Sequence, residues 1–129
     1  MNTLRNVLRI NALTSFSGGA AAAISPGTVD ELLGTGQTGW VRLVGLGLVA
    51  FAVVVVLASR APTDQLLAGA RSISLADASW VVGSIGTIVA GWYSTGGAVV
   101  VAIVAVMVGV FGTAQYVLSR EAGRRLAHA

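Results

Sequence analysis

We predict an all-α fold, a four-helix transmembrane bundle with both termini in the cytoplasm, from three features of the sequence. Hydrophobic residues make up 55 % of the 129 residues and charged residues only 10 %, whereas a soluble domain carries roughly 25 % charged residues. Four apolar stretches each approach the ~20 residues that a helix needs to cross the hydrocarbon core of a bilayer. Arginines gather at the ends of these stretches, on one side of the bundle. We therefore expect residues 1–129 to form a single transmembrane domain.

The four predicted spans cover residues 8–24, 40–59, 73–92 and 97–118. We expect helices because backbone groups in lipid have to form their hydrogen bonds within the segment itself. The first stretch has a second interpretation, a cleaved signal peptide, because Arg5 and Arg9 precede an apolar region that ends in alanines. Six small or polar residues interrupt that region, and this favours a span.

Short connections are expected between the spans. The residues Thr-Val-Asp-Glu at 28–31 are typical of a capping box and predict a surface helix of one or two turns that ends at Gly34. Residues 60–71 are expected to form the second loop, with room for a short turn of helix. Residues 93–96 form a tight third connection, which predicts that the third and fourth spans pair as an antiparallel hairpin.

The distribution of arginine predicts the orientation. Four spans place both termini on one side of the membrane, and seven of the eight arginines then share that side with the termini, while Arg42 lies on the other. Because positively charged residues mark cytoplasmic segments, we expect both termini in the cytoplasm. Trp40, Trp92 and Tyr93 fall at the opposite ends of their spans, where an aromatic belt is expected. The predicted location is the inner (plasma) membrane, as a multi-pass protein.

Asp77 is the one acidic residue within a predicted span. The pattern Ser-Leu-Ala-Asp at 74–77 resembles a capping box and would place Asp77 in the first turn of the third span. The alternative is an ion or proton site, since a carboxylate inside a membrane is a functional candidate by default. Asn11 and Gln115 are expected at the same depth. We predict a polar layer of Asn11, Asp77 and Gln115 whose hydrogen bonds hold the bundle together.

Small residues recur along the fourth span at spacings of four and three. Such a spacing places them on one helix face, and small side chains let helix backbones approach closely in lipid. We expect close packing within the bundle, with an oligomer interface as the alternative. The predicted helix-packing stripe consists of Ala98, Ala102, Ala105, Gly109 and Gly112.

The composition excludes most catalytic chemistry. The chain has no cysteine, and its one histidine is His128, next to the last residue. We therefore expect no enzyme activity, no catalytic residue, no metal site and no cofactor, because paired acid–base or metal chemistry lacks its parts. The arginines occur mainly at the ends of apolar stretches, a topology signal rather than a nucleic-acid site.

Two functions remain open. The first is a non-catalytic structural or accessory subunit that contacts the lipid bilayer and associates with another membrane subunit or with a second copy of itself. The second is a small-solute or ion transporter or channel that uses the polar layer around Asp77.

Three segments carry a resemblance to known proteins. The first runs from Leu-Arg at 4–5 to Leu-Arg-Ile-Asn-Ala at 8–12, and the others are Arg-Leu-Val-Gly-Leu-Gly-Leu at 42–48 and Ala-Asp-Ala-Ser-Trp-Val at 76–81. With them, nearly the whole chain resembles small four-span bacterial integral membrane proteins of unknown function. The resemblance implies four spans and no particular activity. The lack of lysine and the abundance of alanine, valine and arginine suit a bacterial origin.

Overall fold

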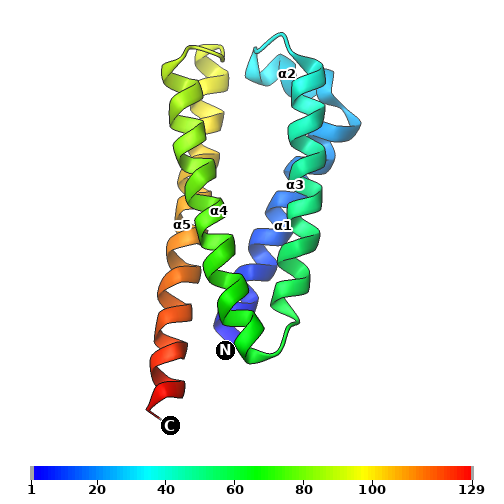
Figure 1. Cartoon of the computed structure of the whole chain (residues 1–129). Helices are drawn as coiled ribbons and strands as arrows, with labels where there is room; N and C mark the ends of the chain where they lie inside the picture. Colours follow the sequence, from blue (N-terminus) through cyan, green and yellow to red (C-terminus); the bar gives the residue numbers. More distant parts are fainter. Residues whose placement is uncertain (1, 129) are drawn as a thin grey trace.

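The structure, a computed structural model, describes residues 2–128 and is built of five helices with short connections (Figure 1). No strand occurs between residues 2 and 128, so the prediction of an all-α fold is confirmed. The helices are α1 Asn2–Ile24, α2 Pro26–Leu33, α3 Thr38–Ser59, α4 Thr63–Val89 and α5 Thr95–Ala127.

Three helices are long and apolar enough to cross a membrane: α3, α4 and α5. These helices support the interpretation of the chain as a membrane protein. α1 has 23 residues, long enough to cross, but polar side chains interrupt its apolar sequence and it is not among the three.

The long helices form two antiparallel hairpins. α1 packs along α3, and α4 packs along α5 (Figure 1). Ser94 ends the connection between α4 and α5, and its Oγ accepts a hydrogen bond of 3.1 Å from the backbone N–H of Gly97 at the start of α5. The predicted hairpin of the third and fourth spans is confirmed.

The two ends of the molecule differ. One end, here called the terminal end, holds the start of α1, the end of α5 and the turn between α3 and α4 (Figure 1). There the hairpins converge on a buried apolar cluster that includes Leu8, Val55 and Leu66. At the opposite, distal end the hairpins separate, and α2 connects them by packing against both α3 and α5. The backbone N–H of Ser94 donates to the Leu33 carbonyl over 3.0 Å in this bridge.

Two glycines bring α1 and α3 into backbone contact. A Cβ atom placed on Gly45 would lie 2.7 Å from the Gly19 carbonyl oxygen and 2.7 Å from the Ala23 backbone nitrogen. A Cβ atom on Gly19 would lie 2.8 Å from the Gly45 carbonyl oxygen. Close helix approach in a membrane depends on small residues of this kind. This crossing is not among the features expected from the sequence.

Three helix boundaries differ from the prediction. α4 begins at Thr63, so the expected loop over residues 60–71 is wrong, and only residues 60–62 connect α3 to α4. α1 begins at Asn2 and α5 continues to Ala127. The physical reason is visible in α4, where Leu66 and Ala70 are fully buried. Burial of one apolar side stabilises a helix even where the other residues are polar.

α2 also differs in its detail. It begins at Pro26, and no side chain caps its first turn. The capping box expected at 28–31 is therefore wrong. Gly34 ends the helix in the left-handed conformation, with φ 72°, as predicted.

Asp30 uses its carboxylate at the C-terminal end of α2 instead. The carboxylate accepts hydrogen bonds from the Thr35 hydroxyl, from the Thr35 backbone N–H over 3.0 Å and from the Gly36 backbone N–H over 2.9 Å. These bonds, above all the one from the Thr35 side chain, hold the pKa of Asp30 below its usual range because they stabilise the charged form.

Candidate functional site

The structure brings together Asn11, Asp77 and Gln115, which come from α1, α4 and α5. The Asn11 Nδ2 donates to the Asp77 Oδ2 over 3.1 Å and to the Gln115 Oε1 over 2.8 Å. The Gln115 Nε2 donates to the same Asp77 Oδ2 over 2.9 Å. The three residues are 1 %, 3 % and 0 % exposed. We call these three side chains the polar cluster.

Small groups make the space for Asp77 between α4 and α5. A Cβ atom on Gly112 would lie 3.1 Å from the Asp77 Cβ and 3.6 Å from the Ser74 carbonyl oxygen. The missing side chain at Gly112 therefore lets the two helices approach at the level of the carboxylate. Gln115 lies one turn further along α5, where its amide reaches the Asp77 Oδ2.

The two carboxylate oxygens of Asp77 have different surroundings. Oδ2 accepts both amide hydrogen bonds, from Asn11 and from Gln115. Among the described residues, none donates a hydrogen bond to Oδ1, and no arginine bonds to the carboxylate. The Asn11 Oδ1 accepts a bond of 3.3 Å from the Ser15 hydroxyl. The cluster therefore pairs its amides internally and leaves one carboxylate oxygen free for a proton, a cation or another donor.

The interpretation of Asp77 as a helix cap is wrong. α4 begins at Thr63, so Asp77 lies in the middle of the helix. The Ser74 hydroxyl donates to the Ala70 carbonyl oxygen over 2.9 Å, a bond to the preceding turn rather than to a helix end. The expected cap depended on a helix start at residue 73, and the polar residues at 63–65 and 71–72 concealed the true start.

The predicted helix-packing stripe is only partly in contact with α4. Ala105 and Gly112 are buried, and a Cβ atom on Gly109 would lie 3.8 Å from the Val81 Cγ2. Ala98 is half-buried, while Ala102 is exposed, which contradicts its predicted place in the contact. Because three residues turn a helix by about 300°, Ala102 points about 60° away from Ala105.

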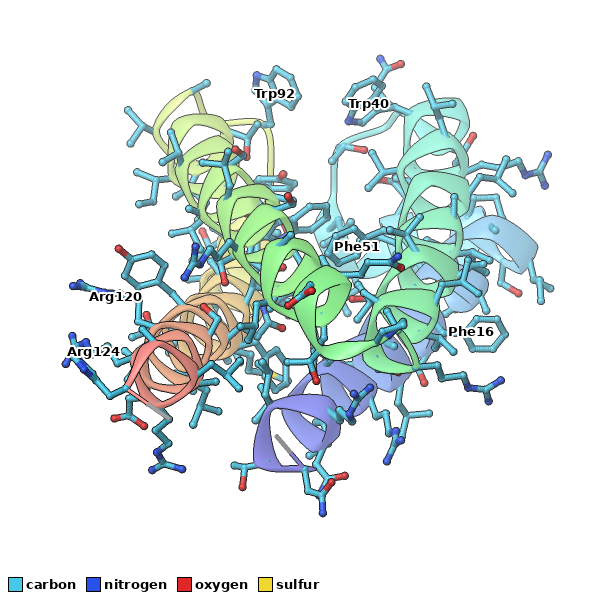
Figure 2. The ribbon with its side chains drawn as sticks, turned by 60° about the horizontal axis from the view of Figure 1, so that its bottom comes forward. Phe16, Trp40, Phe51, Trp92, Arg120 and Arg124 are labelled. Atoms are coloured by element: carbon cyan, nitrogen blue, oxygen red, sulfur yellow. The ribbon has the colours of Figure 1, made fainter. Side chains whose placement is uncertain are left out.

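An opening separates α3 from α4 at the distal end. A cavity of about 530 Å³ lies there, lined by Thr35, Gln37, Trp40, Gly91 and Trp92. Figure 2 shows Trp40 and Trp92 on the two sides of this opening, with Phe51 deeper between the hairpins. We call this feature the α3–α4 opening.

One face of α4 passes from a packed to an uncovered environment along its length. At the terminal end, a Cβ atom on Gly69 would lie 3.2 Å from the Ala58 Cβ of α3. Gly83 lies fourteen residues later, close to the same face, because seven residues complete nearly two turns. Nothing lies within 4 Å of a Cβ atom placed on Gly83. The face that packs on α3 at one end is therefore open at the other.

Trp80 carries an unpaired polar atom close to the polar cluster. It lies one turn after Asp77 on α4, and its buried Nε1 has no hydrogen-bond partner among the described residues. Buried indole N–H groups usually find a partner. Trp80 and Asp77 are three residues apart and therefore share one face of α4, but this spacing gives no sign that the N–H would be unpaired.

Residues 2–128 contain no group of three or more histidine, aspartate or glutamate side chains placed to hold a metal ion. No protein-family signature, curated protein or solved structure matches the chain. The interpretation of the site therefore depends on the residues of this chain alone.

Proposed function

We propose that the chain is a four-span bacterial inner-membrane protein with a non-catalytic structural or accessory role. The packing of α1 supports a fourth span. α1 runs antiparallel along α3 with its backbone in contact at Gly19 and Gly45, so a bilayer that surrounds the apolar α3 also surrounds α1. Seven arginines near the terminal end support cytoplasmic termini.

The α3–α4 opening is the observation that carries this proposal. On α4, Gly83 lies close to the face that packs on α3 at Gly69, with open space around it, and small residues are what helices use to pack closely in lipid. A transmembrane helix of another membrane subunit would cover this face. The polar cluster stabilises the packing of the helices, because it joins α1, α4 and α5 through mutual hydrogen bonds.

Photo-crosslinking in native membranes tests the proposal, and the absence of cysteine makes single-cysteine variants straightforward. Gly83→Cys, labelled with a benzophenone maleimide, is the test variant. Val82→Cys is the matched control, because Val82 is 70 % exposed and points about 100° away. We expect Gly83→Cys to crosslink to an apolar helix of a second polypeptide, identified by mass spectrometry, and Val82→Cys to give lipid adducts. Equal protein adducts from both sites, or none from Gly83→Cys, would reject the proposal.

A second function, transport of a small solute or ion, is favoured by one specific observation. The Asp77 Oδ1 and the Trp80 Nε1 lie one turn apart on α4, and both lack a partner among the described residues. Together they offer one acceptor and one donor. Flux across liposomes, measured over a panel of ions and small solutes, tests this function. Transport that is lost in Asp77→Asn, a variant that still folds, would establish it in place of the accessory role.

A further inference from the structure

A hollow lies on the outer side of the α1–α3 hairpin, near the terminal end and away from the α3–α4 opening. Its volume is about 410 Å³. Figure 2 shows Phe16 projecting on this side of the hairpin. The lining consists of apolar side chains from both helices, together with Ser59, Arg9 and Arg60.

The shape of the hollow follows from side-chain size. Ala12 and Ala52 are 2 % and 3 % exposed and form the floor between the two helices. Leu13, Phe16 and Leu57 are 67 %, 51 % and 64 % exposed and form the walls. Exposure of these apolar side chains to water would be unfavourable, whereas contact with an acyl chain would bury them. The hollow therefore suits a hydrocarbon chain lying between α1 and α3.

Two arginines give the hollow a positively charged end. Arg9 and Arg60 both line it and are exposed. The described hydrogen bond of Arg9 goes to the Asn6 Oδ1 over 3.3 Å, so no carboxylate occupies its guanidinium. Arg5 donates to the carbonyl oxygens of Ser59 and Ala61 over 2.8 and 2.9 Å, which fixes the backbone on both sides of Arg60. Guanidinium groups bind phosphate oxygens with several hydrogen bonds.

We propose that this hollow binds one anionic phospholipid, with an acyl chain between α1 and α3 and the phosphate held by Arg9 and Arg60. On the proposed four-span topology, on which this inference rests, the hollow is a basic site between transmembrane helices at the cytoplasmic side, and such a site matches the chemistry of anionic headgroups. The site shares no lining residue with the cavity at the α3–α4 opening. Its occupancy is therefore independent of the proposed accessory role.

Native mass spectrometry of the detergent-solubilised protein tests the site. Phosphatidylglycerol and phosphatidylcholine with identical acyl chains are titrated separately, and the bound lipid is counted. We expect preferential binding of one phosphatidylglycerol. The double variant Arg9→Gln/Arg60→Gln should weaken this binding about 25-fold, at about fivefold for each arginine. The control Arg120→Gln/Arg124→Gln removes the same charge from the terminal end of α5 (Figure 2) and should leave binding within about twofold.

A competition experiment distinguishes a phospholipid headgroup from a free phosphate compound as the ligand of the two arginines. Glycerol phosphate without acyl chains should fail to displace the lipid, because the apolar hollow supplies part of the affinity. Equal binding of both lipids, an equal loss in both double variants, or displacement by free glycerol phosphate would each overturn the proposal. The melting temperature of each variant confirms that it is folded before binding is compared.

Discussion

Gly112 of α5 lies directly against Asp77 of α4, where a Cβ atom on Gly112 would be 3.1 Å from the Asp77 Cβ. The carboxylate is directed past this glycine toward the amide of Gln115, and the amide of Asn11 reaches the same oxygen from α1. Three helices from two hairpins therefore share one hydrogen-bonded centre. This arrangement makes the identity of residue 77 matter for stability, whatever its role in function.

Asp77→Asn should fold with a free energy of unfolding within about 1 kcal/mol of the parent, because asparagine retains an oxygen acceptor for the two amide donors. Asp77→Leu should lose about 1–3 kcal/mol, because the buried Gln115 Nε2 is left without its acceptor. Thermal melting in detergent measures both changes.

Ser79→Leu is the control for this pair, since Ser79 is exposed on the same helix and should melt like the parent. An unchanged melting temperature in Asp77→Leu would contradict the proposal that the polar cluster stabilises the bundle.

Gly45→Ala should destabilise the α1–α3 hairpin by about 1–3 kcal/mol, because the new methyl group would overlap the α1 backbone and force the helices apart. Gly47→Ala is a matched control two residues away, where nothing lies within 4 Å of the new Cβ. The control should be neutral or stabilising by up to about 1 kcal/mol through its higher helix propensity. Unfolding in detergent compares the two, and equal stabilities would show that the glycine crossing is not a close contact.

Acidification should loosen the loop after α2. The pKa of Asp30 is lowered in the folded protein, so its contribution is complete above the unfolded value of about 3.9 and fades as the pH falls through the lower folded pKa. The backbone amides of Thr35 and Gly36 donate to this carboxylate. Their protection from hydrogen exchange, corrected for intrinsic rates, should be high at neutral pH and should fall only at a pH below the usual pKa of aspartate.

Two variants make this exchange experiment specific. Asp30→Ala should remove the protection of the two amides at every pH, because it removes their acceptor. Glu31→Gln, at the exposed neighbouring position, should preserve both the protection and its pH dependence. Protection that stayed constant in the parent through acid pH would contradict the assignment to Asp30.

The approach of Asn11, Asp77 and Gln115 could be predicted from the sequence because depth in a span follows directly from residue count. Asn11 and Asp77 lie near the starts of two predicted spans and Gln115 near the end of a third, so antiparallel pairing places them at one level. The same reasoning predicted the turn at Ser94, since polar residues between two apolar stretches leave few other positions for it.

Other features depend on spatial neighbours that the sequence does not reveal. Hydropathy marks where a helix meets lipid, whereas α4 begins at Thr63 because buried Leu66 stabilises a helix end that starts with three polar residues. The glycine at position 45 is indistinguishable in sequence from the one at position 47, yet only Gly45 contacts the α1 backbone. Which side of α5 would face α4 also depended on packing, so the exposure of Ala102 could not be derived from spacing alone.

The bridge through α2 closes one side of the distal end. Leu33 accepts a hydrogen bond from Ser94, and its backbone lies against Gly97, so the distal ends of α2 and α5 are joined. The α3–α4 opening is thus the unjoined side of that end (Figure 1). On the proposed function, a helix of another membrane subunit would enter between the two hairpins from this side, because α2 closes the other side of the distal end.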